Sequence, residues 1–206
     1  LFEATLAARE RVLGAEHPAT LMSRNNLAAV YQAAGRLGEA IPLYEATLAA
    51  YERVLGAEHP ATLTSRNNLA YAYQAAGRLS EAISLFEATL AARERVLGAE
   101  HPATLMSRNN LAAVYQAAGR LGEAIPLYEA TLAAYERVLG AEHPDTLNSR
   151  NNLAAVYQAA GRLSEAIPLF EATLAAYERV LGAEHPATLT SRNNLAYAYR
   201  LQNDSV

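Results

Sequence analysis

Histidine is the side chain best suited to acid–base or metal chemistry in this sequence, and every copy precedes a proline. A glutamate stands before each of them, so a Glu-His pair recurs at His17, His59, His101, His143 and His185. A zinc ion needs several ligands around one point, whereas equivalent residues on stacked helices lie about 10 Å apart. Catalysis normally gathers unlike titratable groups with separated pKa values, and a copied pair does not. We therefore expect no catalytic residue, no metal site and no cofactor.

Asparagine and glutamine form a second recurring series with a different chemistry. Adjacent asparagines occur five times, and the first members of the pairs are Asn25, Asn67, Asn109, Asn151 and Asn193. Glutamines follow at Gln32, Gln74, Gln116 and Gln158. Because an amide both donates and accepts hydrogen bonds, a ladder of amides can hold the backbone of an extended peptide. The alternative, stronger for the second asparagine of each pair, is a hydrogen bond to a neighbouring repeat.

Both series recur because the whole chain is built from copies of one unit. Residues 1–42 and 85–126 are identical, and residues 43–84, 127–168 and 169–200 differ from them at few positions. A period of 42 residues indicates a helical repeat, in which each unit is too small to bury its own apolar face and must stack on its neighbours.

Each unit has the signals of two helices joined by a short turn. Pro60 suits the first turn of a helix, and Gly77 suits the end of that helix. A second helix carries an apolar stripe up to Gly98. The short connection makes the two helices antiparallel neighbours. The sequence thus predicts one array over residues 1–200, with ten helices and a tail at 201–206. Its parts are half repeats at 1–13 and 186–200 and full repeats at 18–55, 60–97, 102–139 and 144–181.

The unit resembles the tetratricopeptide repeat family. The family pattern of a leucine, a small residue, a tyrosine, a glycine, an alanine, an aromatic residue and a proline is matched by Leu69, Ala70, Tyr73, Gly77, Ala82, Phe86 and Pro102. The longer motif LG-x2-HP, NNLA-x2-Y and G-x3-EA is similar to the 42-residue repeats of kinesin light chains and of bacterial arrays. One departure is Arg66, which stands where the family has a bulky aromatic residue.

This resemblance implies an all-α, right-handed superhelical solenoid of antiparallel helix pairs. In the family, the first helix of each pair lines a concave groove that binds a protein or an extended peptide. In kinesin light chains, the positions that match the repeated asparagines are implicated in contact with cargo peptides. The resemblance therefore implies that the amide series described above belongs to a binding groove.

Differences between the copies mark a second set of candidate groove residues. One position of the first helix varies as Met22, Thr64, Met106, Asn148 and Thr190. Another, seven residues later and on the same helix face, varies as Ala29, Tyr71, Ala113, Ala155 and Tyr197. Variation at these positions beside an invariant core is what a binding surface would show. Neutral drift at tolerant exposed sites is the alternative.

Composition narrows the classes of partner. The chain has a formal net charge of −4, no lysine and no cysteine, which argues against nucleic acid and excludes disulfides. No apolar run is long enough to cross a membrane, and we expect a cytoplasmic protein. The leading interpretation is a module that binds a protein or peptide. Its rival is a structural scaffold, natural or engineered, that associates head to tail through the bare faces of the first and last helices.

Overall fold

A computed structural model describes residues 1–204, and this part of the chain contains ten helices and no strand. The predicted all-α helical-repeat fold is confirmed. None of the helices in the described part is long and apolar enough to span a membrane. The chain divides into two compact units, Leu1–Ala99 and Glu100–Val206, which we describe in turn.

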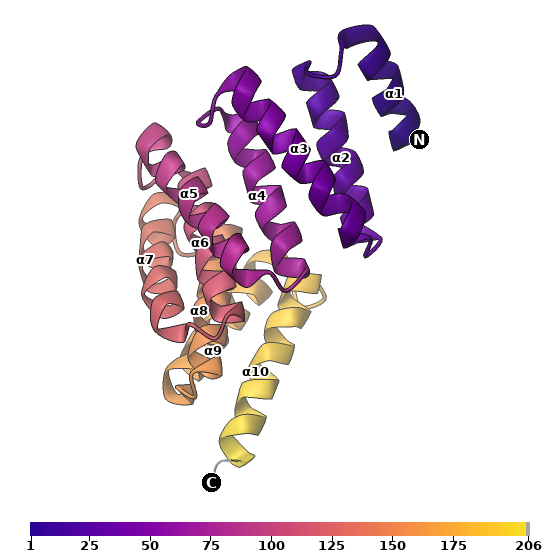
Figure 1. Ribbon diagram of the computed structural model, residues 1–206. Coiled ribbons are helices and arrows are strands. Elements are labelled where there is room, and N and C mark those ends of the chain that lie inside the picture. The colour runs from indigo at the N-terminus through magenta and orange to yellow at the C-terminus, as the bar shows by residue number, and fades with distance from the viewer. Residues whose placement is uncertain (205–206) are drawn as a thin grey trace. The chain divides into compact units, whose positions relative to one another are not determined.

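The first unit consists of five helices, each packed against the next along the chain (Figure 1). They are α1 (Phe2–Leu13), α2 (Pro18–Ala33), α3 (Leu37–Leu55), α4 (Pro60–Ala75) and α5 (Leu79–Leu97). The first helices of neighbouring repeats, α2 and α4, also contact each other directly. This contact is what can bring equivalent side chains of two repeats to one surface.

The second unit also consists of five helices, but it begins and ends with a first helix of a pair, whereas the first unit begins and ends with a second helix. They are α6 (Pro102–Ala117), α7 (Leu121–Leu139), α8 (Pro144–Ala159), α9 (Leu163–Leu181) and α10 (Pro186–Asp204). Here α8 and α10 are the first helices of neighbouring repeats that contact each other. The last helix runs four residues past residue 200, so residues 201–204 are helical where the sequence suggested a tail. Residues 205–206 of that tail lie outside the described residues.

The recurring histidines have a structural task at the start of the first helices. The Nδ1 atom of His59 accepts a hydrogen bond of 3.1 Å from the backbone N–H of Ala61, and each other copy caps its own helix in the same way. The cap satisfies one of the N–H groups that a helix start leaves unpaired. Pro60 has no backbone N–H of its own to satisfy, so it suits the first position of the helix, directly after the capping histidine.

A glycine follows the end of each first helix except α10, and the chain turns there into the second helix. Helix α4 ends at Ala75, and Gly77 has a φ of +74°, a conformation that a side chain disfavours. The backbone N–H of Arg78 donates to the carbonyl of Tyr73, and that of Gly77 donates to the carbonyl of Gln74, as in a Schellman motif. In α10 the equivalent position is Asn203, and the helix continues through it.

The core is a repeated contact between the two helices of one pair. Leu21 of α2 is fully buried against Ala50 and Tyr51 of α3, with Leu55 packed beside them. The second unit has the same contact twice, around Leu105 and Leu147. A bulky aromatic residue on each second helix from α3 onward is also buried, as Tyr44, Phe86, Tyr128 and Phe170. These contacts leave the outer faces of the first helices free to vary.

Candidate functional site

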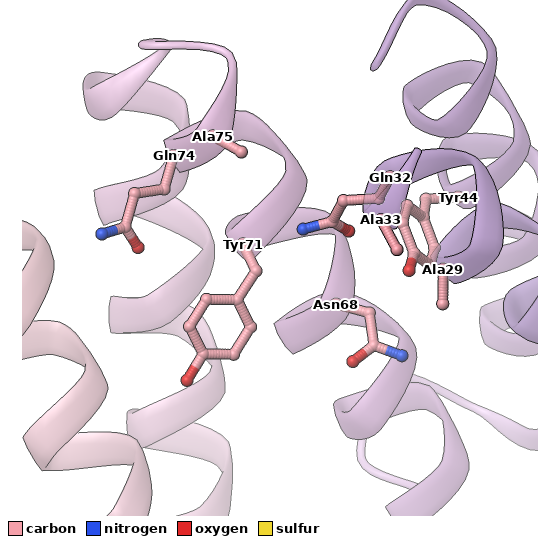
Figure 2. Close-up of a pocket in the computed structure, with 8 residues that line it drawn as sticks. All are labelled: Ala29, Gln32, Ala33, Tyr44, Asn68, Tyr71, Gln74 and Ala75. Atoms are coloured by element: carbon pink, nitrogen blue, oxygen red, sulfur yellow. The ribbon is translucent and has the colours of Figure 1, made fainter. Parts of the chain in front are cut away.

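A hollow of about 690 Å³ lies between the first helices of two neighbouring repeats, α2 and α4. Three of the residues predicted from the sequence, Gln32, Tyr71 and Gln74, line it. In Figure 2 the side chain of Gln32 extends from α2 towards α4, and the ring of Tyr71 extends away from Gln32. The rest of the lining consists of the second asparagine of one pair, three alanines and a core tyrosine, namely Asn68, Ala29, Ala33, Ala75 and Tyr44.

Tyr71 is the large side chain that shapes this hollow. Its ring packs edge-on against Phe86, with centroids 5.2 Å apart and planes at 78°, a favoured aromatic geometry. Burial raises the pKa of Tyr71, and a hydrogen bond with Asn67 acts in the opposite direction. The side chain nevertheless remains 39% exposed. The contact with Phe86 therefore fixes the Tyr71 ring, and the exposed part of the ring is open to a ligand.

The first asparagines of the pairs lie beneath this surface in the first unit. Asn25 and Asn67 are both buried. The hydroxyl of Ser65 donates a hydrogen bond of 3.2 Å to Oδ1 of Asn25, which joins α4 to α2. Their amides therefore support the hollow more than they line it. The second asparagine, Asn68, faces the hollow instead.

In the second unit the asparagines bond to each other across repeats. The Nδ2 atom of Asn152 donates to Oδ1 of Asn109 over 3.4 Å, and that of Asn194 donates to Oδ1 of Asn151 over 3.2 Å. For these two residues, the alternative assignment of the second asparagine to an inter-repeat hydrogen bond is confirmed. The amide ladder exists here, but its amides are already bonded to each other.

A smaller hollow of about 230 Å³ lies between α8 and α10, and the predicted residues Asn148 and Asn151 line it together with Thr190. The Tyr177 hydroxyl also faces it and donates a hydrogen bond of 2.6 Å to Oδ1 of Asn148. The other predicted residues line neither hollow. Asn193, Tyr197, Met22, Met106 and Thr64 are exposed, and Asn109, Gln116 and Gln158 are half-buried.

Charge is largely cancelled around the hollow of the first unit. The recurring arginine of the first helix pairs with a glutamate on the preceding helix, at 2.7 Å for Arg66 with Glu52 and at 2.8 Å for Arg24 with Glu10. No charged side chain is among the residues that line the hollow between α2 and α4. In the described part of the chain, no three His, Asp or Glu residues gather as a metal site would require.

Four lining residues, Ala33, Tyr44, Asn68 and Ala75, were not among the predicted site residues. The sequence contained a signal for Asn68, because it belongs to a repeated amide pair, but helix periodicity alone did not show which member faces outward. Tyr44 reads as a core aromatic residue, and it is indeed almost fully buried. Tyr44 of α3 lines the hollow because the neighbouring residues of α2, Ala29 and Ala33, have side chains too small to cover it.

The sequence profile of the tetratricopeptide repeat matches the chain in five overlapping segments, residues 1–51, 21–95, 65–136, 104–179 and 145–205. The matches span nearly the whole sequence, and the chain belongs to the tetratricopeptide repeat family. No curated protein matches the sequence. The family consists of repeat modules that generally serve in protein interaction or as scaffolds.

Solved structures of similar repeat proteins agree with this assignment. A Podospora anserina protein described as a kinesin light chain with nearly identical TPR-like repeats is 40% identical, with 91% of this chain and 89% of that chain covered and a TM-score of 0.79. A variant of that protein with a single substitution is 39% identical, with the same coverage and a TM-score of 0.80. BtubC (BKLC) from P. vanneervenii is 21% identical over 98% of this chain and 85% of its own, with a TM-score of 0.80, and shares the fold.

Proposed function

We propose that this chain is a non-catalytic binding module and that the hollow between α2 and α4 holds an extended, uncharged segment of a partner protein. The observation that carries the proposal is the lining itself. Gln32, Asn68 and Gln74 offer amide donors and acceptors around an apolar floor. Amides suit the backbone of an extended peptide, and an apolar floor suits one of its side chains.

Tyr71 gives this site its asymmetry and is the residue on which we expect affinity to depend. Tyrosine combines a large apolar surface with a polar tip and is enriched among residues that dominate interface energies. Its edge-on contact with Phe86 fixes the ring, so little rotamer freedom is lost on binding. The equivalent positions of the other first helices carry alanine at 29, 113 and 155 and tyrosine at 197.

The chain itself supplies the variant that tests this proposal. Residues 71–72 read Tyr-Ala, whereas the equivalent pairs at 29–30, 113–114 and 155–156 read Ala-Val. Tyr71→Ala with Ala72→Val therefore converts one natural repeat type into the other. Binders are selected from a library of random unstructured peptides, and their affinity is measured by fluorescence anisotropy. We expect the double variant to lose about 10-fold or more in affinity.

The matched control is the same exchange in the second unit, Tyr197→Ala with Ala198→Val. Tyr197 is exposed on α10 and lines neither hollow, so we expect selected peptides to bind this variant like the parent chain. Equal losses in both variants, or no loss in either, would show that the hollow beside Tyr71 is not the binding site.

A further inference from the structure

Helix α8 departs from the other first helices at two positions of its outer face. Asp145 stands where the other first helices have alanine, and Asn148 stands where they have methionine or threonine. The two residues are three apart, so they share one face of the helix, and both are exposed. The other four first helices have no acidic residue in their first turn. The second unit therefore has a carboxylate that the equivalent positions of the other repeats lack.

The carboxylate of Asp145 has no arginine partner among residues 1–204. The recurring arginines of α8 and α10 pair with glutamates instead, as Arg150–Glu136 and Arg192–Glu178 do. The Nδ1 atom of His143 lies 3.7 Å from Oδ2 of Asp145. That nitrogen already accepts the backbone N–H of Asp145, so it has no hydrogen to donate to the carboxylate. The negative charge of Asp145 is therefore available to a ligand.

This charge acts on the hollow of about 230 Å³ between α8 and α10. Asn148, less than one helical turn after Asp145, lines the hollow together with Tyr177 of α9. Burial raises the pKa of Tyr177, and the negative charge of Asp145 raises that pKa further. The electrostatic field of Asp145 therefore reaches a side chain that lines the hollow.

Ser191 adds a buried hydroxyl that bonds to nothing in the described part of the chain. The residue is 1% exposed and lines the hollow, and its Oγ atom has no hydrogen-bond partner. In the first unit the equivalent Ser65 donates to Oδ1 of Asn25. In the second unit Oδ1 of Asn151 accepts from Asn194 instead. Because a buried polar group without a partner is costly, a donor bound in the hollow would remove that cost.

The hollow belongs to the contact between two repeats. Ala187, which lines it, packs against the buried cluster that contains Leu147 and Tyr177, so this side of α10 faces the preceding repeat. The three lining residues of α10 have the same identities as residues 61, 64 and 65 of α4. What distinguishes this site among the repeats is therefore the pair Asp145 and Asn148 of α8.

We propose that this hollow, with Asp145 at its edge, binds the side-chain ammonium of a lysine in a partner protein. An ammonium has three N–H donors and no acceptor. The hollow offers it acceptors, since the Ser191 hydroxyl is unpaired and Oδ1 of Asn148 has a second lone pair beside its bond from Tyr177. These acceptors come from two helices, which suits the three donors of an ammonium better than the planar fork of a guanidinium.

This site differs in chemistry from the hollow between α2 and α4, where no charged side chain is among the lining residues. The two sites share no residue. Binding of lysine in the second unit can therefore fail while peptide binding in the first unit holds, and the reverse is equally possible.

Side-chain amide NMR with a short model peptide tests the proposal. The probe is acetyl-Gly-Gly-Lys-Gly-Gly-amide, whose only charge is the lysine ammonium. We expect the side-chain signals of Asn148 and Asn151 to shift saturably at millimolar peptide, while those of Asn68 and Gln74 stay in place. The same peptide with an acetylated lysine should give no saturable shift, and an arginine peptide should bind more weakly. No shift with the lysine peptide, equal shifts with the acetylated one, or tighter binding of the arginine peptide overturns the proposal.

A natural repeat type supplies the matched variant. Asp145→Ala with Asn148→Thr gives α8 the residues that α4 and α10 already carry at these positions, so the fold should survive, as circular dichroism can verify. We expect the lysine peptide to lose about 10-fold or more in affinity, followed through the Asn151 signal. The control is Glu142→Ala, because Glu142 carries the same charge but is paired with Arg179. Equal losses in both variants would show a general effect of net charge and would refute the site.

Ser191→Ala separates a role in binding from a role in the fold. The substitution removes a buried hydroxyl that has no partner, so thermal unfolding should show no loss of stability. Affinity for the lysine peptide should fall about 10-fold, the scale of a hydrogen bond to a charged group. A variant that binds the lysine peptide like the parent chain, whether or not its stability changes, would contradict the proposed contact with the ammonium.

Discussion

The grooves of the two units are built from nearly the same residues and offer different surfaces. Between α2 and α4 lies a hollow of about 690 Å³ with amides at its edge. Between α8 and α10 the hollow is about 230 Å³, and Asn151 and Asn194 are bonded to each other beside it. An amide group that is hydrogen-bonded within the chain is not free to bond a ligand through the same atoms. The comparison teaches that copies of one repeat need not be equivalent as binding sites.

The two hollows lie at different levels of the first helices, because Gln32, Tyr71 and Gln74 line one, whereas Asn148, Asn151 and Thr190 line the other. Helix α4 carries Tyr71 and Ala72 where α8 carries Ala155 and Val156. In α4 the tyrosine stands over Phe86 and forms one wall of the hollow. In α8 no aromatic side chain occupies that position. Helix α10 carries the same pair as α4, Tyr197 and Ala198, but Tyr197 lines neither hollow.

The largest expected effect is the loss of stability on removing a buried aromatic residue, and it distinguishes the core that both units share from the support of Tyr71. Phe86→Ala and Phe170→Ala each delete a buried aromatic side chain and should each cost about 3–5 kcal/mol in the free energy of unfolding. Phe86 also supports Tyr71, so Phe86→Ala alone should also weaken peptide binding. Chemical denaturation followed by circular dichroism measures the first effect, and anisotropy measures the second. A cost below about 1 kcal/mol at either site contradicts their place in the core.

The next effect concerns the amides. Asn152→Ala removes the hydrogen bond to Asn109 and should cost about 0.5–1.5 kcal/mol in unfolding free energy. Asn68 occupies the same repeat position but faces the hollow, so Asn68→Ala should cost less and should reduce peptide affinity instead. Denaturant titration of the two variants provides the comparison. If Asn68→Ala proves the more destabilising of the two, the division of roles between the units is wrong.

Introducing the Tyr-Ala pair of α4 into α8 should sharpen the comparison with only a small change in stability. Ala155→Tyr with Val156→Ala gives α8 the residues of α4, a combination that the fold already accepts. We expect unfolding free energy to change by less than about 1 kcal/mol, because the tyrosine enters a position that stays 39% exposed in α4. A crystal structure of the variant should show the new tyrosine packed edge-on against Phe170. A ring that points into solvent instead would mean that sequence at these two positions does not determine the wall.

The smallest effect is a change with alkaline pH. Burial and the hydrogen bond to Glu129 raise the pKa of Tyr157 to about 12, from about 10 in an unfolded chain. The protonated hydroxyl is the form that the fold favours, so its stabilising contribution is present below about pH 10 and is lost as pH rises towards about 12. Ultraviolet absorbance measures tyrosine ionisation. Tyr157→Phe should remove absorbance change near pH 12. Loss of the absorbance change near pH 10 instead would contradict the raised pKa of Tyr157.

Most of the fold follows from the sequence, because each helix start and turn is signalled by a residue with a known backbone preference. His-Pro at 59–60 and Gly77 define the ends of α4 within two residues. The last helix differs for the same kind of reason, since Asn203 stands where the other repeats have a glycine, and no turn signal stops α10 at residue 200.

The candidate site follows from the sequence only in part. Spacing placed Gln32, Tyr71 and Gln74 on one face, and the structure brings all three to one hollow. The sequence could not predict that Asn25 and Asn109 have different hydrogen-bond partners, because both belong to the same Ser-Arg-Asn-Asn segment. One accepts from Ser65 and the other from Asn152. Which neighbour an amide bonds depends on small differences in helix packing, and a repeated sequence does not encode these locally.

The central claim is that the amides between α2 and α4 contact a bound peptide, and side-chain amide NMR tests it most directly. A two-dimensional nitrogen–proton spectrum is recorded as a selected peptide is added, with the amides assigned through single Asn and Gln substitutions. The account predicts that the side-chain signals of Gln32, Asn68 and Gln74 shift together, while those of Asn152 and Asn194 stay in place. Shifts confined to Asn152, Asn194 or residues outside the hollow would contradict it.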